Sequence, residues 1–421
     1  MTTTAHHKIL IVFLAVFSLS LALSKTAVNV VMTLTYLTSL VLIVRYQEYR
    51  KSILANISQP LVIPLLAYLA VTVIGIIYTE KLADGLGIAN KVAGLFLVYF
   101  MTSVVIDVVH DADERAKLTD NLILIFIAGV LVLDVIGLLT YLGFIADRKF
   151  SLPVYPLHVH HIWFSNLNAV GVYAALSFFL FGRERLASAK KTLLTGFILL
   201  AILCILLSIS RTAWFGMIAT GIVLSWLLAE RKKVFYVTLA FVAAGSLLAY
   251  RFNPIVHDRV SSIFSDISQY AAGQTYTSLG DRFVMWKAAA SMFLSNPPLG
   301  VGTGDYMPTM RLYVASGTVP ARILDYNQPH NMYLFSLATN GILGLGALLF
   351  IFYRIFEFTR PFRDIPPGQK QLSFLATAVA VHYLVAGMTD SLFNIFILRF
   401  SFAFVMGICI RTGSVHPAGS R

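Results

Sequence analysis

Charged residues are scarce in this sequence of 421 residues. Only 12% are charged and 58% are hydrophobic, whereas about a quarter of the residues in soluble globular domains are charged. This composition excludes an ordinary soluble domain and indicates that a lipid bilayer surrounds most of the chain. The 32 Lys and Arg outnumber the 20 Asp and Glu, but they lie in short clusters between apolar runs. A nucleic-acid-binding protein gathers its basic residues on one face or helix, so no nucleic-acid partner is expected.

Cysteine is nearly absent as well. Cys204 and Cys409 both lie inside apolar runs, which excludes a disulfide framework and a Cys-based zinc site. The sequence contains neither a Walker motif nor a dinucleotide fingerprint, so ATP-driven and nicotinamide-dependent chemistry are excluded. We therefore expect no nucleotide and no cofactor.

Long apolar runs dominate the chain, and a transmembrane helix needs about 20 mainly apolar residues. Twelve stretches fit: 9–24, 27–44, 61–78, 88–106, 121–144, 164–182, 192–210, 212–229, 234–250, 332–353, 372–389 and 392–410. The first could be a signal peptide, because Lys8 precedes it and Ala22-Leu23-Ser24 resembles a cleavage site. A retained helix is preferred because the second stretch follows almost at once. The sequence thus predicts an all-α, polytopic integral membrane protein with about twelve transmembrane helices.

The distribution of Lys and Arg between the loops predicts the orientation, because positive residues stay on the cytoplasmic side. With a cytoplasmic N-terminus, the cytoplasmic segments hold more than half of the Lys and Arg. The short outer connections hold far fewer: Lys25, Lys81, Lys91, Arg148, Lys149 and Arg211. Both termini are therefore predicted to be cytoplasmic.

The connection at 252–330 is much longer than the others, and long structureless loops are uncommon unless they are functional. Two apolar stripes at helical spacing predict two helices within it, and we expect both stripes to pack against the membrane helices. The stripes are Val260, Ile263, Phe264 and Ile267, and Phe283, Trp286, Ala290 and Phe293. A Gly-rich turn at 300–304 follows the second helix. The predicted organisation is transmembrane helices 1–9 at 1–251, an outer loop with the functional residues at 252–330, helices 10–12 at 331–411 and a cytoplasmic tail at 412–421.

Two arginines on the outer side are candidate functional residues. Arg211 closes the seventh stretch, where a permanent charge is costly in lipid and should face a wet cavity or a partner. The alternative is an arginine that snorkels from a helix end. Arg282 lies in the long loop beside Asp281, and the alternative there is a solvated pair at a helix start.

His330 is the candidate general base. It follows Pro329 and directly precedes the tenth stretch, so its backbone is fixed near the outer membrane surface. Imidazole changes its charge near neutral pH and can accept a proton from a reacting hydroxyl. The alternative is an ordinary interfacial residue. Gly341, Gly344 and Gly346 give the following helix a small-residue face, which close helix packing explains.

Other polar groups have simpler explanations. His158, His160 and His161 lie close together, but neighbouring side chains of an extended stretch point in opposite directions and no Cys completes a zinc set. No metal site is therefore expected. Asp111 and Asp113 lie in a short cytoplasmic loop and are interpreted as solvated.

Four ionisable residues lie within or at the end of predicted spans: Asp134, His382, Asp390 and Arg399. Intramembrane charge is functional by default, but mutual pairing is the simpler explanation. Asp390 and Arg399 flank a tight outer turn, so they can simply neutralise one another.

Several of these motifs, taken in order, resemble the O-antigen ligase and O-antigen polymerase superfamily. They are Arg211, Asp281-Arg282 with Trp286, the turn Asn296-Pro297-Pro298-Leu299-Gly300-Val301-Gly302, and His330-Asn331 followed by Gly341 and Gly344. The resemblance covers residues 200–350 and agrees with the twelve-span layout. It implies a fold similar to the multispan, lipid-donor (GT-C type) glycosyltransferases, with the long loop on the periplasmic side of a bacterial inner membrane.

The implied activity is transfer of a glycan from undecaprenyl diphosphate to lipid A-core, which makes the lipid-linked glycan and lipid A-core the expected partners. Arginine presents a planar charged fork that suits a departing diphosphate, so Arg211 and Arg282 would replace a metal ion. His330 would be the base, with Asn331, Asp390 and Trp286 as possible supporting residues. Direct attack by the acceptor would invert the anomeric configuration.

Two alternatives remain. An O-antigen polymerase would use the same donor with a lipid-linked glycan as acceptor. A transporter of lipid-linked oligosaccharides would move the donor without cleaving it. Transporters commonly place substrate groups near the membrane midplane in helices arranged as repeats, whereas the candidate residues here lie at the outer face and the sequence shows no repeat.

Overall fold

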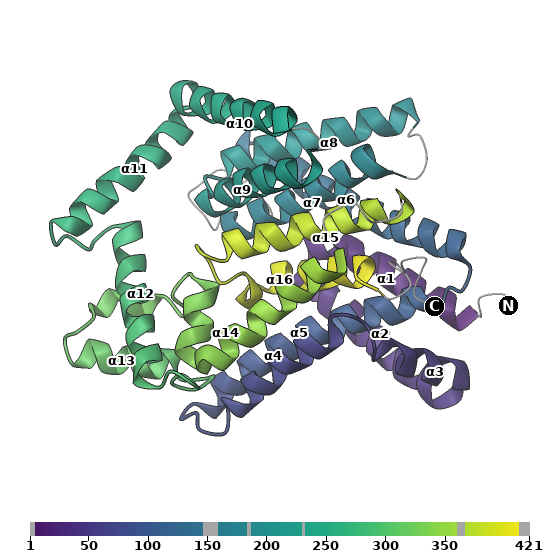
Figure 1. Ribbon diagram of the computed structural model, residues 1–421, viewed down its shortest axis with the longest axis horizontal. Helices are drawn as coiled ribbons and strands as arrows, with labels where there is room; N and C mark the ends of the chain where they lie inside the picture. Colours follow the sequence, from purple (N-terminus) through teal and green to yellow (C-terminus); the bar gives the residue numbers. More distant parts are fainter. Residues whose placement is uncertain (1–4, 146–158, 183–186, 230–231, 360–366, 412–421) are drawn as a thin grey trace.

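The computed structural model describes residues 5–145, 159–182, 187–229, 232–359 and 367–411. Within these ranges the secondary structure is entirely helical (Figure 1). The helices are α1 (Ala5–Leu23), α2 (Lys25–Arg45), α3 (Gln47–Asn56), α4 (Val62–Ile74), α5 (Leu82–Asp107), α6 (Ala112–Tyr141), α7 (His161–Phe181), α8 (Ser188–Leu207), α9 (Arg211–Leu228), α10 (Lys232–Phe252), α11 (Pro254–Ala271), α12 (Ser278–Ser295), α13 (Tyr306–Ala315), α14 (Met332–Thr359), α15 (Pro367–Ala386) and α16 (Phe396–Cys409), with short 3₁₀ turns η2 (Ala321–Asp325) and η3 (Leu392–Asn394).

A helix lies over each of the twelve predicted apolar stretches: α1, α2, α4 to α10 and α14 to α16. Among the described residues, eight helices are long and apolar enough to cross a membrane, and α1, α4 and α16 provide shorter apolar segments. Their outer surfaces carry many exposed Leu, Ile, Val and Phe side chains, as lipid-facing helices do. The prediction of an all-α, polytopic membrane protein is confirmed.

The long connection lies at one end of the helix bundle. The start of α1 and the end of α16 lie at the opposite end from α12 and α13 (Figure 1). Both predicted helices of this connection are present as α11 and α12, and α13 and η2 were not predicted.

The expected packing of the two apolar stripes is only partly correct. Phe264 and Ile267 of α11 are exposed, at 69% and 47%, because α11 extends away from the bundle between α10 and α12 (Figure 1). In α12 the residues that pack against α13 and α14 are Met285, Ala288, Ala289 and Met292, and the predicted stripe is only half-buried.

The Gly-rich turn connects α12 to a kink in α14. At Gly341 the backbone adopts φ 62°, and a Cβ there would lie 2.4 Å from the Pro298 carbonyl group. The kink frees the carbonyl oxygens of Ala338 and Thr339, which accept hydrogen bonds from the backbone N–H groups of Val301 and Gly302. The Gly-rich turn and Gly341, which both belong to the motifs that resemble the superfamily, therefore hold the outer end of α14 in place.

Candidate functional site

His330 contacts a buried carboxylate. Its Nδ1 lies 3.2 Å from Oδ1 of Asp390, which follows α15 in the chain. The backbone of His330 is left-handed, with φ 49°, and Trp286 of α12 fixes the preceding residue because its indole N–H donates to the Pro329 carbonyl oxygen at 2.9 Å. If Nδ1 carries the proton and donates to Asp390, Nε2 is left unprotonated as a base.

Asp390 is held by more than His330. Its side chain is 2% exposed, and Oδ1 also accepts hydrogen bonds from Gln328 Nε2 at 3.2 Å and from the Ser391 backbone N–H at 2.7 Å. Burial alone would raise the pKa of this carboxyl group. The hydrogen bond and charge of His330, the charge of Arg282 and the Ser391 N–H outweigh burial, and the pKa is lowered.

Asn331 has a structural role. Its Oδ1 accepts hydrogen bonds from the backbone N–H groups of Tyr333 and Leu334, each at 3.0 Å, and its Nδ2 donates to the Met388 carbonyl oxygen. It therefore caps α14 and ties it to the loop that carries Asp390.

Arg211 is the first residue of α9 rather than the last of the seventh span. The sequence interpretation was wrong by one helix, because α8 ends at Leu207 and Ile209 takes a left-handed conformation in the turn. One Arg211 Nη donates to Ser278 Oγ of α12 at 3.1 Å. The other, Nη1, is buried and has no hydrogen-bond partner among the described residues.

Arg282 lies one helical turn beyond Ser278 on α12, so the two residues share a face. Its charge acts on both Arg211 and Asp390. The structure thus brings Arg211, Arg282, Asp390 and His330 into one region, although the sequence separates them widely. Burial lowers the pKa of Arg282, and the charges of Asp390 and Tyr326 act in the opposite direction.

Asp281 does not pair with its neighbour Arg282. Its Oδ1 instead accepts from Arg322 Nε at 2.8 Å, and its Oδ2 lies 3.4 Å from the Tyr326 hydroxyl. The Arg282 guanidinium forms no hydrogen bond or ion pair with any described residue. The solvated Asp281–Arg282 pair considered from the sequence is therefore not present.

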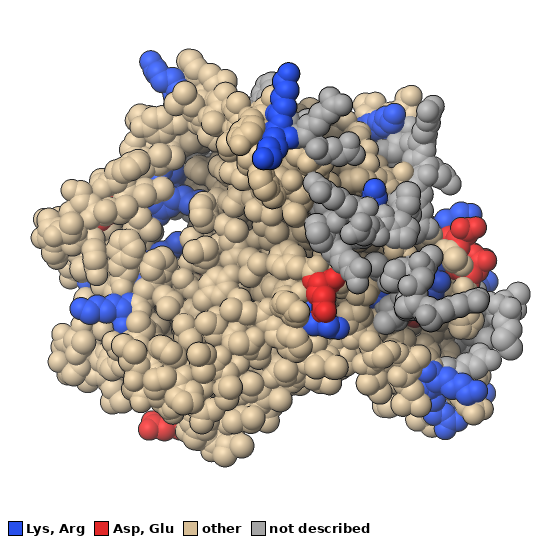
Figure 2. All heavy atoms as spheres, viewed as in Figure 1, with Lys and Arg blue, Asp and Glu red and all other residues tan. Residues whose placement is uncertain are grey.

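Basic side chains gather in the hollow between α11 and the bundle (Figure 2). Arg259 of α11 acts electrostatically on Arg211, and Asp266 of α11 opposes that positive charge. Arg259 was not singled out from the sequence, where it is only one of many charged residues in a helix-forming segment.

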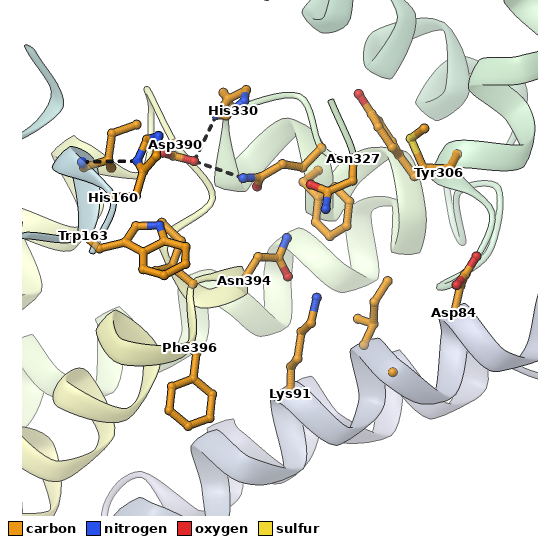
Figure 3. Close-up of a pocket in the computed structure, with 18 of the residues that line it drawn as sticks. Asp84, Lys91, His160, Trp163, Tyr306, Asn327, His330, Asp390, Asn394 and Phe396 are labelled. Atoms are coloured by element: carbon orange, nitrogen blue, oxygen red, sulfur yellow. Dashed lines mark hydrogen bonds and ion pairs between the residues drawn. The ribbon is translucent and has the colours of Figure 1, made fainter. Parts of the chain in front are cut away.

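A cavity of about 620 Å³ lies beside Asp390 (Figure 3). His330 and Asp390 line it, and so do residues of α5, the starts of α2 and α7, and the segments around 304–307, 327–328 and 394–396. Arg211 and Arg282 do not line it.

Of the three clustered histidines, His160 caps the start of α7. The His160 side chain accepts a hydrogen bond from the Ile162 N–H at the start of α7 and lines the cavity. Burial lowers its pKa, and the charges of Asp390 and His330 act in opposite directions on it. His158 lies outside the described residues. Within the described ranges, no three His, Cys, Asp or Glu side chains are grouped as metal ligands.

The predicted neutralisation of Asp390 by Arg399 is wrong. Asp390 contacts His330, whereas Arg399 Nη1 donates to the Phe393 carbonyl oxygen at 2.9 Å and its guanidinium lies over the Phe400 ring. His382 is buried between Asn166 and Tyr173, both within hydrogen-bonding distance of its ring. Asp134 is fully buried in α6.

The predicted position of Lys91 is also wrong. It was counted with the outer connections, but it lies inside α5 and lines the cavity. The only available signal was a lysine near the start of the apolar stretch 88–106, close enough to its edge to be counted with the outer connection.

The described fold and site are those of a polytopic membrane protein with a basic region and a His–Asp pair at one end of its bundle. Residues 196–350, which include Arg211, Arg282 and His330, match the family model described as O-Antigen ligase. The resemblance seen in the sequence is confirmed over this segment. An O-antigen ligase of Escherichia coli (strain K12) is 21% identical over 144 residues, which are 34% of this chain and 34% of that protein. The chain thus aligns with about a third of that relative's length.

Proposed function

We propose that this protein is an inverting glycosyltransferase that transfers O-antigen from undecaprenyl diphosphate to lipid A-core. The observation that carries the proposal is the position of two arginines beside a His–Asp pair: one Arg211 nitrogen and the Arg282 guanidinium have no hydrogen-bond partner among the described residues. Cationic groups that are partly buried and unpaired fit an anionic ligand. The match of residues 196–350 to the O-Antigen ligase family model supports the choice of donor.

In the proposed reaction, Arg211 and Arg282 bind the diphosphate of the donor. The acceptor hydroxyl attacks the anomeric carbon, and its proton passes to Nε2 of His330 as the new C–O bond forms. The bond from the anomeric carbon to the phosphate oxygen breaks, and its electron pair leaves with undecaprenyl diphosphate. Asp390 holds the imidazole through Nδ1 and stabilises the imidazolium that forms.

The arginines would supply the positive charge that stabilises the leaving diphosphate, so the reaction is proposed to need no metal ion. We further propose that the site faces the periplasm, with both termini cytoplasmic in a bacterial inner membrane. The excess of Lys and Arg at the opposite end supports this orientation.

The test is to incubate the purified full-length protein with undecaprenyl-diphosphate-linked glycan and lipid A-core, with no nucleotide and with excess chelator. Glycosylated lipid A-core and free undecaprenyl diphosphate are the expected products. His330→Asn should abolish transfer, because Asn tolerates the left-handed backbone but is no base. The matched control is His257→Asn, an exposed histidine of α11, which should transfer normally.

Other outcomes contradict the proposal in different ways. Longer lipid-linked glycan that forms without lipid A-core would identify a polymerase. An uncleaved donor that is only moved across a vesicle membrane would identify a transporter. Activity that chelation removes and a divalent metal restores would show that the arginines do not replace a metal.

A further inference from the structure

The cavity beside His330 has a chemistry of its own, distinct from that of the arginine region. The arginines approach Asp390 from α9 and α12, whereas the cavity is lined from α5, α7 and the segment before α16. His330 and Asp390 form part of its wall. A group bound in this cavity would therefore reach His330 from a different side than a diphosphate on Arg282.

Lys91 places a positive charge inside this cavity. It is the tenth residue of α5, about 13 Å along the helix from its first residue, and its side chain points into the cavity toward Asn394 (Figure 3). Lys91 forms no hydrogen bond or ion pair with any described residue. The charges that act on it are those of Arg399, which is also positive, and Asp84.

Asp84 does not neutralise Lys91 directly. The two residues are seven positions apart on α5, which separates them by about 10 Å along the helix axis. Figure 3 shows their side chains leaving the helix at separate places along the cavity wall. An ammonium group inside a membrane protein without a counter-ion is costly, so an anionic ligand is the natural partner of Lys91.

Uncharged polar groups line the same cavity. The side-chain amides of Asn327 and Asn394 form no hydrogen bonds with described residues, and the Gln328 Oε1 is buried without a partner among them. Trp163 and Phe396 add aromatic surface. Apolar rings with a few converging amide groups and one charge suit a ligand with many hydroxyls and an acidic substituent.

We propose that this cavity binds the acceptor saccharide, and that Lys91 binds an acidic substituent on it, either a phosphate or a carboxylate. This inference rests on the proposed glycosyltransferase function. It gives the His330–Asp390 pair a donor on the arginine side and an acceptor on the Lys91 side. The acceptor hydroxyl would face Nε2 of His330 while its acidic substituent remains on Lys91.

The test compares Lys91→Met with wild type in initial transfer rates, varying acceptor at saturating donor and then donor at saturating acceptor. We expect the acceptor KM to rise about 10- to 100-fold, the range expected for a lost charge-assisted hydrogen bond, and the donor KM to stay unchanged. Lys91→Arg should keep most of the acceptor affinity. The control is Lys81→Met, which removes an exposed lysine just before α5 that does not line the cavity.

Acceptors stripped of phosphate, of carboxylate or of both identify the group that Lys91 binds. Wild type should lose affinity for the stripped acceptor until it matches Lys91→Met, which should hardly respond to stripping. Unchanged acceptor KM in Lys91→Met, with active wild type, would overturn this inference and leave the proposed function intact. An equal penalty for Lys91→Met on native and stripped acceptors would also overturn it. Absence of transfer by wild type would instead overturn the proposed function itself.

Discussion

Asp390→Asn tests the proposed mechanism most sharply, because the geometry around this residue limits what the change can do. The His330, Gln328 and Ser391 donors all converge on Oδ1. An Asn in this position keeps its carbonyl oxygen toward them, because the flipped amide would place an NH2 group against three donors. The imidazole therefore keeps its orientation and its Nδ1–H tautomer, and only the negative charge is lost.

The magnitude follows from that single loss. A hydrogen bond to a charged group is worth about 1 to 2 kcal/mol more than one between neutral groups. If the full difference acts on the transition state, kcat should fall about 5- to 30-fold. Asp390→Ala should be much worse, because it leaves three donors without their acceptor.

The assay is single-turnover transfer with purified protein, at saturating donor and acceptor, between pH 6 and 8. The pKa of Asp390 is lowered, so its negative charge is fully present above the ordinary Asp range and is lost only as the pH falls through the lowered value. Asp390 is therefore charged throughout this interval, and the wild-type protein should be faster than Asp390→Asn at every pH within it. A rate within twofold of wild type, or one as low as that of His330→Asn, would refute the assignment of a purely electrostatic role.

Three further outcomes are expected. His330→Ala and His330→Gln should both lose about 10²- to 10⁴-fold in turnover at normal protein abundance, and substantial activity in either would leave the mechanism without its base. Arg211→Lys and Arg282→Lys keep the charge but lose the planar fork, so each should lower kcat/KM for the donor at least tenfold. The control Arg311→Lys changes an exposed arginine and should not lower it. Equal kcat/KM in all three variants would remove the diphosphate assignment. Gly341→Ala should destabilise the protein by about 1 to 3 kcal/mol, because the added Cβ would meet Pro298. Gly346→Ala, in open space on the same helix, should leave thermal unfolding in detergent unchanged, and indistinguishable melting of the two variants would contradict the role given to the kink.

The helices could be predicted because membrane insertion depends on local composition. A run of about 20 apolar residues is sufficient evidence for a span, and all twelve stretches coincide with helices. The same local rule placed Lys91 at the end of a span rather than inside it. The rule gives no exact helix boundary, and an additional turn of helix precedes the apolar run in α5.

The pairings of charged residues could not be predicted, because they depend on how distant helices pack. From the sequence, Arg399 is the nearest opposite charge to Asp390 and Arg282 the nearest to Asp281. The structure instead joins Asp390 to His330 and Asp281 to Arg322, partners 60 and 41 residues away. Residue type and position at the outer face identified the arginines and His330 as candidates. Their proximity to Asp390 follows only from the packing of α9, α12, α14 and α15.

Asp390 lies close to both Arg282 and His330, and this position leads to a test that separates the donor site from the base. Asp390 acts on Arg282 as well as on His330, so in the free protein its charge offsets part of the guanidinium charge that would bind the diphosphate. Removing this charge should weaken the base and at the same time strengthen anion binding by Arg282. Undecaprenyl diphosphate, the proposed product, should therefore inhibit Asp390→Asn at a lower concentration than wild type, although turnover has fallen. Arg282→Lys should show both slower turnover and weaker inhibition by undecaprenyl diphosphate, because the group that binds the anion is itself impaired. Weaker inhibition of both variants would mean that Asp390 supports the diphosphate site instead of competing for its arginine, and the division of roles between Arg282 and His330 would have to be abandoned.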